Sequence, residues 1–516
     1  MKIGFASIYS ARPQPQFAVY LASLFRNDGH EVSFLTCDSS FPCCLNHVVR
    51  ELPRTVECGI CILGGIRSFP VKNIWRVRRS LNGGLDQQTA RKLAFSSAVN
   101  VSRAESEAQF RGQVVEDLQA QFAPSVDIAY TNARQWITKE KLEGVILFNG
   151  RMEVTRGILQ ACRDAGISFL TYERTLVGHG LWMVPNEDCM FLARYNEVLA
   201  AYRDVPLNGL QACRSASFLA QRLLRRTKLE WRIYNQSAKE IAWPVAGAKR
   251  KILVLPGSRS EREGNPAWKS AYDDLPAALS ELCPRIDARP HEVVVRAHPL
   301  WTQAIGKWQG CEANNVWRYA ATQAGYHFIE SDSNVDTLGL IRQADLIVSN
   351  GSSALLEAGA MGKRCICIGH SHYETAGFAR HILEPSDWES LARDREVDSL
   401  QIIRRTLRCI YTQGWRYPQY VDFVRGITPT EYQFLEGGSS LPLLEMLRTG
   451  IVQVNDTLCG TDDGFEYNVA RRFEVGDIED LSRFEEENHK RTIPIKRRML
   501  LRWVDVVRKM GKKGDL

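Results

Sequence analysis

The sequence predicts an α/β protein with two Rossmann-like, doubly wound domains and a C-terminal helical tail. Short apolar runs alternate with helical patterns, as they do in parallel sheets covered by helices. The alternation stops at residues 242–248, AWPVAGA, a composition typical of a linker, and then restarts. The chain has 516 residues, which is long enough for two such domains.

The first domain is predicted over residues 1–243. Helical patterns such as Phe17–Arg26 separate its strands, and the long polar segment at about 73–139 predicts a helical insertion. Residues 190–235 are also predicted to be helical. The expected strands are Ile3–Ile8, Val32–Leu35, Gly59–Leu63, Val145–Phe148 and Ser168–Tyr172.

The second domain is predicted over residues 249–412, and an extension follows over 413–516. Residues 413–460 look irregular, and part of them is expected to cross back to the first domain. The expected strands of the second domain are Lys251–Leu255, Glu292–Arg296, Tyr326–Ile329, Leu346–Val348 and Cys365–Ile368.

The segment from Val348 to Gly369 predicts a strand, a turn, a helix and a second strand. Its turn holds Asn350, Ser352 and Ser353 at the carboxyl end of a strand, where parallel sheets bind phosphates. The two serines can equally act as helix caps. Glu357 follows in a helix of small and apolar residues, so this acid needs a partner such as a sugar hydroxyl.

Two more strand ends of the second domain carry polar groups. His298 follows one strand, in the sequence RAHP, and Ser258 and Arg259 follow another. Serines, a histidine and an arginine at neighbouring strand ends are suited to a nucleotide phosphate. The alternative for His298 is a turn residue without a ligand. The loop His370–Tyr373 is a secondary candidate.

Strand ends of the first domain predict an acceptor site. Asn149 and Arg151 close one strand, and Glu173 and His179 follow the next. Glu173 is the leading candidate for the base that deprotonates an acceptor hydroxyl, with His179 second. The alternative for Glu173 is a structural ion pair with a neighbouring arginine. Arg12, in the turn after the first strand, is expected to contact acceptor.

Composition favours a cytoplasmic protein. No apolar run is long enough to cross a membrane, and the first residues resemble a strand rather than a signal peptide. The 14 cysteines are scattered through apolar runs, which indicates free thiols in a reducing compartment. Cys58 and Cys61 form a CxxC pair without further ligands at zinc spacing. We therefore expect no bound metal.

The tail at 490–516 carries ten Lys or Arg and two Asp. Met499, Leu500, Trp503, Val504 and Val507 have helical spacing, and basic residues including Arg497, Arg498, Arg502, Arg508 and Lys509 lie among them. This pattern predicts a basic amphipathic helix on an anionic membrane surface. An equally good interpretation is a terminal helix packed by its apolar stripe. Nucleic-acid binding is not expected, since no nucleic-acid module accompanies the tail.

The sequences RAHP (296–299) and SNGSSALLEAGAMGKRCICIG (349–369) resemble the donor domain of GT-B glycosyltransferases. The resemblance covers about residues 251–378, and the most similar group is that of bacterial capsule polysaccharide synthesis, which includes the β-Kdo transferases. It implies a GT-B fold whose first domain binds acceptor. It also implies that His298 and Ser352 or Ser353 hold the donor phosphate and Glu357 the ribose, without a metal or other cofactor.

One departure concerns the reacting carboxylate. The β-Kdo transferases carry a functional aspartate in the turn after the first strand of this domain. Here the turn reads LPGSRSEREGNPAW and offers only Glu261 and Glu263 as acids. Either a glutamate replaces the aspartate, or the donor and mechanism differ.

The sequence thus predicts a bacterial, metal-independent glycosyltransferase. It would use CMP-Kdo or another nucleotide sugar, act on a lipid-linked or growing glycan of capsule or lipopolysaccharide, and lie peripherally on the inner membrane. Three alternatives stay open. They are a CDP-polyol phosphotransferase of the teichoic-acid type, a sugar-nucleotide 2-epimerase, and a non-catalytic nucleotide-binding scaffold of an assembly complex.

Overall fold

The computed structural model describes residues 1–79, 84–227, 229, 238–305, 307–391, 398–461, 464–486, 489–504 and 506. Its first large sheet has the strand order β3-β2-β1-β4-β5-β6, and only β6 runs antiparallel to its neighbour. The strands are β1 (Lys2–Ala6), β2 (Glu31–Thr36), β3 (Ile74–Arg76), β4 (Gly144–Phe148), β5 (Phe169–Arg174) and β6 (Leu181–Pro185).

The second large sheet repeats this order. Its strands run β11-β8-β7-β12-β13-β14, and all five pairings are parallel. Each sheet therefore has the strand order of a Rossmann fold, with its first strand at the centre. The strands are β7 (Ile252–Leu255), β8 (Val293–Arg296), β11 (His327–Ile329), β12 (Leu346–Ser349), β13 (Arg364–Ile368) and β14 (Arg380–Ile382).

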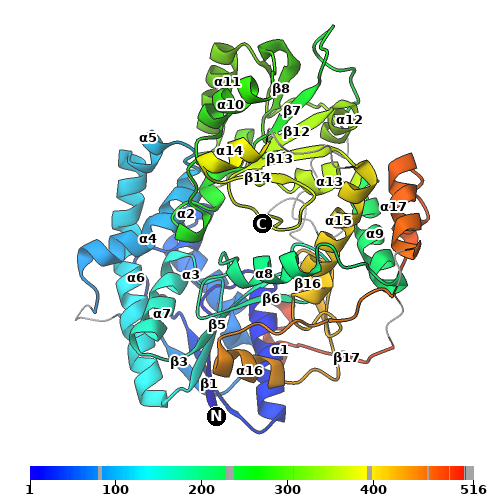
Figure 1. Cartoon of the computed structure of the whole chain (residues 1–516). Helices are drawn as coiled ribbons and strands as arrows, with labels where there is room; N and C mark the ends of the chain where they lie inside the picture. Colours follow the sequence, from blue (N-terminus) through cyan, green and yellow to red (C-terminus); the bar gives the residue numbers. More distant parts are fainter. Residues whose placement is uncertain are drawn as a thin grey trace.

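Helices cover both sheets, and the two Rossmann domains face each other in a GT-B-like arrangement (Figure 1). A small hairpin, β9 (Ala304–Ile305) and β10 (Trp308–Gln309), follows β8. The helices of the two domains are α1 (Gln14–Asn27), α2 (Leu45–Arg50), α3 (Arg54–Gly64), α4 (Gln87–Ser102), α5 (Glu107–Phe110), α6 (Gln113–Glu140), α7 (Glu153–Asp164), α8 (Ala193–Tyr202), α9 (Gly209–Leu223), α10 (Leu275–Arg285), α11 (Cys311–Ala324), α12 (Thr337–Gln343), α13 (Ala354–Ala360), α14 (Pro385–Leu391) and α15 (Ser399–Tyr411).

Local signals explain several helix ends. Asp86 caps α4 by accepting a hydrogen bond from the Thr89 N–H at 2.8 Å. At the other end of a helix, α11 stops at Gly325, whose φ of 71° is easily adopted only without a side chain. Strands β7 and β8 are buried along their whole length, and β1, β4 and β12 are buried except at one end residue, which explains why these strands appear as continuous apolar runs.

The C-terminal extension contacts both domains. Its strands pack on α1, where Phe17 meets Tyr432 edge to face and the Tyr20 hydroxyl donates to the Leu435 carbonyl. Helices α15 and α17 pack against α9, beside α13 (Figure 1). The elements are η6 (Thr412–Arg416), β15 (Val424–Thr428), β16 (Glu431–Leu435), α16 (Leu441–Thr449), α17 (Gly464–Val475), η7 (Leu481–Arg483), β17 (Thr492–Ile493) and η8 (Met499–Leu501).

Two predictions of local structure were wrong. The segment Gly59–Leu63, predicted as a strand, lies within helix α3, because a short apolar run fits either structure. Residues 413–460, predicted as irregular, form η6, β15, β16 and α16. Strands β15 and β16 form a hairpin with each other, and β16 also pairs with β17, which is distant in sequence.

In the described part of the tail, β17 pairs with β16 and is followed by the short helix η8. Arg497 is buried rather than part of an exposed basic face, and it donates to the carbonyls of Leu63 and Gly64 at 3.0 and 3.1 Å. Val507, Arg508 and Lys509 lie outside the described residues. Within the described ranges, no helix combines the length and apolarity needed to span a bilayer.

Candidate functional site

A cavity of about 550 Å³ lies between the carboxyl ends of the two sheets. This is where open α/β sheets bind ligands. The loop after β5 and the end of α9 form one wall, and the ends of β7, β8 and β12 form the other. Among the predicted site residues, the cavity is lined by Glu261, His298, Ser352, Ser353 and Glu357.

Glu357 is held by an arginine of α9. Arg222 Nε and Nη2 donate to Glu357 Oε1 at 2.8 and 2.5 Å, and both side chains are largely buried. No described group donates to the other carboxylate oxygen, Oε2, although it is buried. A buried acceptor without a donor is costly, so this oxygen is suited to a hydroxyl of a bound ligand.

His298 is neutral in this cavity. Burial, helped by the nearby Arg103 and Arg296, lowers the pKa of His298 to about 4. The Leu300 N–H donates to Nδ1 at 3.2 Å. The proton of the neutral ring therefore sits on Nε2, which makes Nε2 a hydrogen-bond donor.

Hydrogen bonds to side-chain oxygens fix the turn after β12. Asn350 Oδ1 accepts from the Gly257 N–H at 2.6 Å, which ties this turn to the one after β7. Ser349 Oγ accepts from the Ser352 N–H at 3.1 Å. Asn350 is buried, so it positions the two turns, whereas Ser352 and Ser353 line the cavity itself.

Three arginines add positive charge to the cavity wall. Arg174 is the last residue of β5, Arg222 lies near the end of α9, and Arg225 follows this helix. Arg225 is paired with the buried Asp336 at 2.6 Å, which fixes its guanidinium. Guanidinium groups are well matched to phosphate oxygens, so this wall is suited to an anionic ligand.

Glu261 is the exposed acid of the cavity. It lies in the short turn after β7. Removal of water by the surrounding protein raises the pKa of Glu261, although Arg151, Arg103 and Arg262 act in the opposite direction. Arg151 is buried and donates to the main-chain carbonyl of Glu261, which holds this turn against the first domain.

The rest of that turn joins the two domains. Arg259 is buried, pairs with Glu107 at 2.5 Å and Glu263 at 3.3 Å, and lies over the Phe110 ring. Glu105 accepts from the Arg259 N–H at 2.6 Å. In the same turn, Ser258 Oγ accepts from Trp301 Nε1 at 3.2 Å. Arg259 and Glu263 are thus used in a contact with the helical insertion.

The remaining predicted residues of the first domain lie outside this cavity's lining. Glu173 accepts from Asn149 Nδ2 at 3.2 Å, Gln14 Nε2 at 3.4 Å and the Arg174 N–H at 3.0 Å. Burial raises the pKa of Glu173, and these hydrogen bonds oppose that shift. Arg12, partly buried, precedes a cis peptide bond to Pro13. His179 lines a second, neighbouring cavity.

Sequence reasoning missed several cavity residues. Arg222 and Arg225 lie in a segment described only as helical, and Gln413 lies in one described as irregular. For Arg222 and Arg225, the signal in the sequence was the clustering of arginines near the end of α9. His372 and Tyr373, from the secondary candidate loop, do line the cavity, whereas His370 pairs with Glu374 at 2.6 Å.

No model of a known protein family matches the chain, and no curated protein matches it. Solved structures that resemble it include two KpsC transferases from Thermosulfurimonas dismutans. The β-Kdo 2,7 transferase is 14% identical, with 68% of this chain and 89% of that chain covered and a TM-score of 0.33. The β-Kdo 2,4 transferase is 16% identical, with 64% and 87% covered and a TM-score of 0.32.

A sugar-nucleotide epimerase also resembles the chain. The UDP-GlcNAc 2-epimerase of Methanocaldococcus jannaschii is 11% identical, with 76% of this chain and 91% of that chain covered and a TM-score of 0.27. Likenesses at these TM-scores carry no argument about activity.

Proposed function

We propose that the chain is a metal-independent glycosyltransferase that moves a sugar from a nucleotide-sugar donor to a lipid-linked or growing surface-polysaccharide acceptor. The single observation that carries this proposal is the buried, unpartnered Oε2 of Glu357 in a cavity between two Rossmann domains. A ribose hydroxyl would donate to this oxygen, and the arginine wall would neutralise the adjoining phosphate.

The donor set we propose is Glu357 for the ribose, with His298, Ser352 and Ser353 for the phosphate. His298 Nε2 donates to a phosphate oxygen, and the serine hydroxyls do the same. Arg174, Arg222 and Arg225 stabilise the negative charge that develops on the leaving phosphate, a role that a metal ion has in other transferases. We leave Arg259 out, because it does not line this cavity and instead contacts the helical insertion through Glu107.

Glu261 is our candidate for the base. The acceptor hydroxyl attacks the anomeric carbon, the bond from that carbon to the phosphate oxygen breaks, and its electron pair leaves with the phosphate. The hydroxyl proton passes to the carboxylate of Glu261, and removal of water by the surrounding protein raises the pKa of Glu261, which makes that carboxylate a stronger base. Glu261 is preferred to Glu173, because Glu173 already accepts three hydrogen bonds.

A thermal-shift panel of CMP-, CDP-, UDP- and GDP-linked ligands tests the donor site, since a ligand that binds only the folded state raises Tm. At least one nucleotide sugar should raise Tm of the wild type and fail to do so in His298→Ala and Glu357→Gln. The proposal is wrong if no nucleotide binds. It is also wrong if both variants keep full affinity for the nucleotide sugar. Turnover of CDP-glycerol in preference to nucleotide sugars, or epimerisation of UDP-GlcNAc without acceptor, would contradict it as well.

We also propose that the tail brings the enzyme to an anionic membrane. Met499, Leu500 and Trp503 are exposed among Arg498 and Arg502, which favours acidic lipid surfaces. Sedimentation with phosphatidylglycerol vesicles should capture the wild type, whereas phosphatidylcholine vesicles should not. The double variant L500S/W503S should stay in the supernatant, and its capture at wild-type level would argue against this surface.

A further inference from the structure

A second cavity, larger than the first, adjoins the proposed donor site. Its volume is about 1190 Å³, and α9, the loop after β5, strand β15 and residues 482–486 form its walls. The two cavities share Leu229. In three pairs of consecutive residues, one member lines the first cavity and the other lines the second. These pairs are Val177–Gly178, Gln221–Arg222 and Arg225–Arg226. The two cavities therefore adjoin along these residues.

We propose that this second cavity binds the acceptor as an oligosaccharide chain, with its reacting end directed towards the donor cavity. The inference rests on the proposed transferase function and names the place and chemical class of its acceptor. The volume exceeds the roughly 300–1,000 Å³ of sites for single small molecules, so it suits a chain of several sugars.

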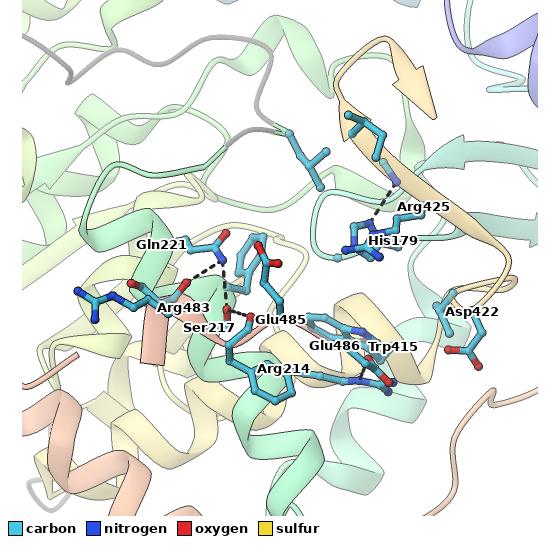
Figure 2. A pocket seen from close by; sticks show the side chains of 18 of the residues that line it. His179, Arg214, Ser217, Gln221, Trp415, Asp422, Arg425, Arg483, Glu485 and Glu486 are labelled. Atoms are coloured by element: carbon cyan, nitrogen blue, oxygen red, sulfur yellow. Dashed lines mark hydrogen bonds and ion pairs between the residues drawn. The ribbon is translucent and has the colours of Figure 1, made fainter. Parts of the chain in front are cut away.

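The polar groups of the cavity are positioned in advance. His179 Nδ1 accepts from the Gly426 N–H at 3.2 Å, and burial lowers the pKa of His179 to about 4. Its Nε2 is thus a donor at neutral pH. Gln221 Nε2 donates to Ser217 Oγ at 3.1 Å, which leaves the amide oxygen as an acceptor. Figure 2 shows His179 and Gln221 on opposite sides of the cavity. Such fixed donors and acceptors match sugar hydroxyls.

The charges lining the cavity are largely compensated. Arg214 makes a two-point contact with Glu486, at 2.9 and 2.6 Å (Figure 2), and Arg226 and Arg483 both pair with Glu479. Such pairs offer donors and acceptors together, which is what a hydroxyl-rich chain needs.

An aromatic surface completes the site. Trp415 is partly buried and lies parallel to Tyr411, with ring centroids 5.7 Å apart and an interplanar angle of 8°. The indole of Trp415 lines the cavity together with Phe218 and Phe484. The apolar faces of sugar rings can stack on such rings while their hydroxyls reach the polar groups around them.

The test is an array of bacterial capsule and lipopolysaccharide oligosaccharides probed with the full chain, followed by calorimetric titration of the strongest binder. The wild type should bind at least one oligosaccharide. Trp415→Ala and Gln221→Ala should each weaken that binding at least about tenfold, or about 1.4 kcal/mol. Both variants should keep wild-type affinity for the nucleotide found in the thermal-shift panel. Tyr319→Ala, which removes an exposed aromatic outside both cavities, should keep both affinities.

Two results would overturn the inference. They are no oligosaccharide binding by the wild type, and unchanged oligosaccharide binding in both cavity variants. The donor site is tested separately. Oligosaccharide binding that survives in a chain unable to bind any nucleotide would contradict the proposed transferase and leave this cavity as a glycan site.

Discussion

Replacement of Arg222 by methionine should destabilise the fold strongly. The Arg222–Glu357 pair is mostly buried, with side-chain exposures of 14% and 11%. Methionine fills a similar volume but leaves the carboxylate in place without its partner. Removing one member of a buried pair costs about 3–5 kcal/mol. At about 2–4 °C per kcal/mol for a domain of this size, Tm should fall by at least about 6 °C.

Differential scanning calorimetry of four proteins measures this effect. The double variant R222M/E357Q should recover most of the lost stability, because no charge is then left unpaired. Arg214→Met is the matched control, since its partner Glu486 is 46% exposed and such pairs are worth about 1 kcal/mol or less. If Arg222→Met melts within about 1 °C of the wild type, or if the double variant is less stable than the single one, the reasoning about this pair is wrong.

Other substitutions test different parts of the structure. Gly359→Ala should cost about 1–3 kcal/mol in urea unfolding, because its Cβ would lie 2.4 Å from Thr406 Oγ1; equal stability would refute the close packing of α13 on α15. Gly59→Ala should instead stabilise by about 0.5–1 kcal/mol, because nothing lies within 4 Å of its Cβ and the site is helical, and a loss would argue against helix α3. Burial raises the pKa of Glu105 to about 7. At a pH between the lower pKa of the unfolded chain and this value, the folded protein keeps a proton on Glu105 that the unfolded chain has lost. The free energy of unfolding should therefore fall as pH rises from about 5 to 7, and Glu105→Gln should flatten this slope; an unchanged slope would exclude Glu105 as its source. Glu261→Gln should lower the transfer rate about 10²–10⁴-fold with unchanged nucleotide affinity, and a smaller loss than in Glu173→Gln would reverse the choice of base.

Most strands of the two large sheets could be predicted because they are largely buried, whereas β3, β6 and β14 were not predicted. Buried strands appear as short continuous apolar runs, and the turns between them carry glycine and polar residues. The same rule failed at Gly59–Leu63, since five apolar residues fit one helical stretch as well as a strand. There the better signal was Pro53, immediately before helix α3, because proline is favoured at helix starts.

The candidate site could be predicted only in part. The second domain's motif indicated His298, Ser352, Ser353 and Glu357, which line one cavity. The expectation that Glu357 needs a partner is answered by Arg222, which lies 135 residues earlier in the chain. No local pattern indicates a contact over such a separation. The same holds for Arg259, whose use in an interdomain contact depends on the helical insertion.

The central claim is that a nucleotide sugar binds at the carboxyl end of the second sheet. Hydrogen–deuterium exchange with and without the nucleotide that most raises Tm tests it directly. We predict slower exchange in residues 296–300 and 351–357, and no such effect in Glu357→Gln. Protection confined to residues 149–153 and 173–179, at the strand ends of the first domain, would contradict it.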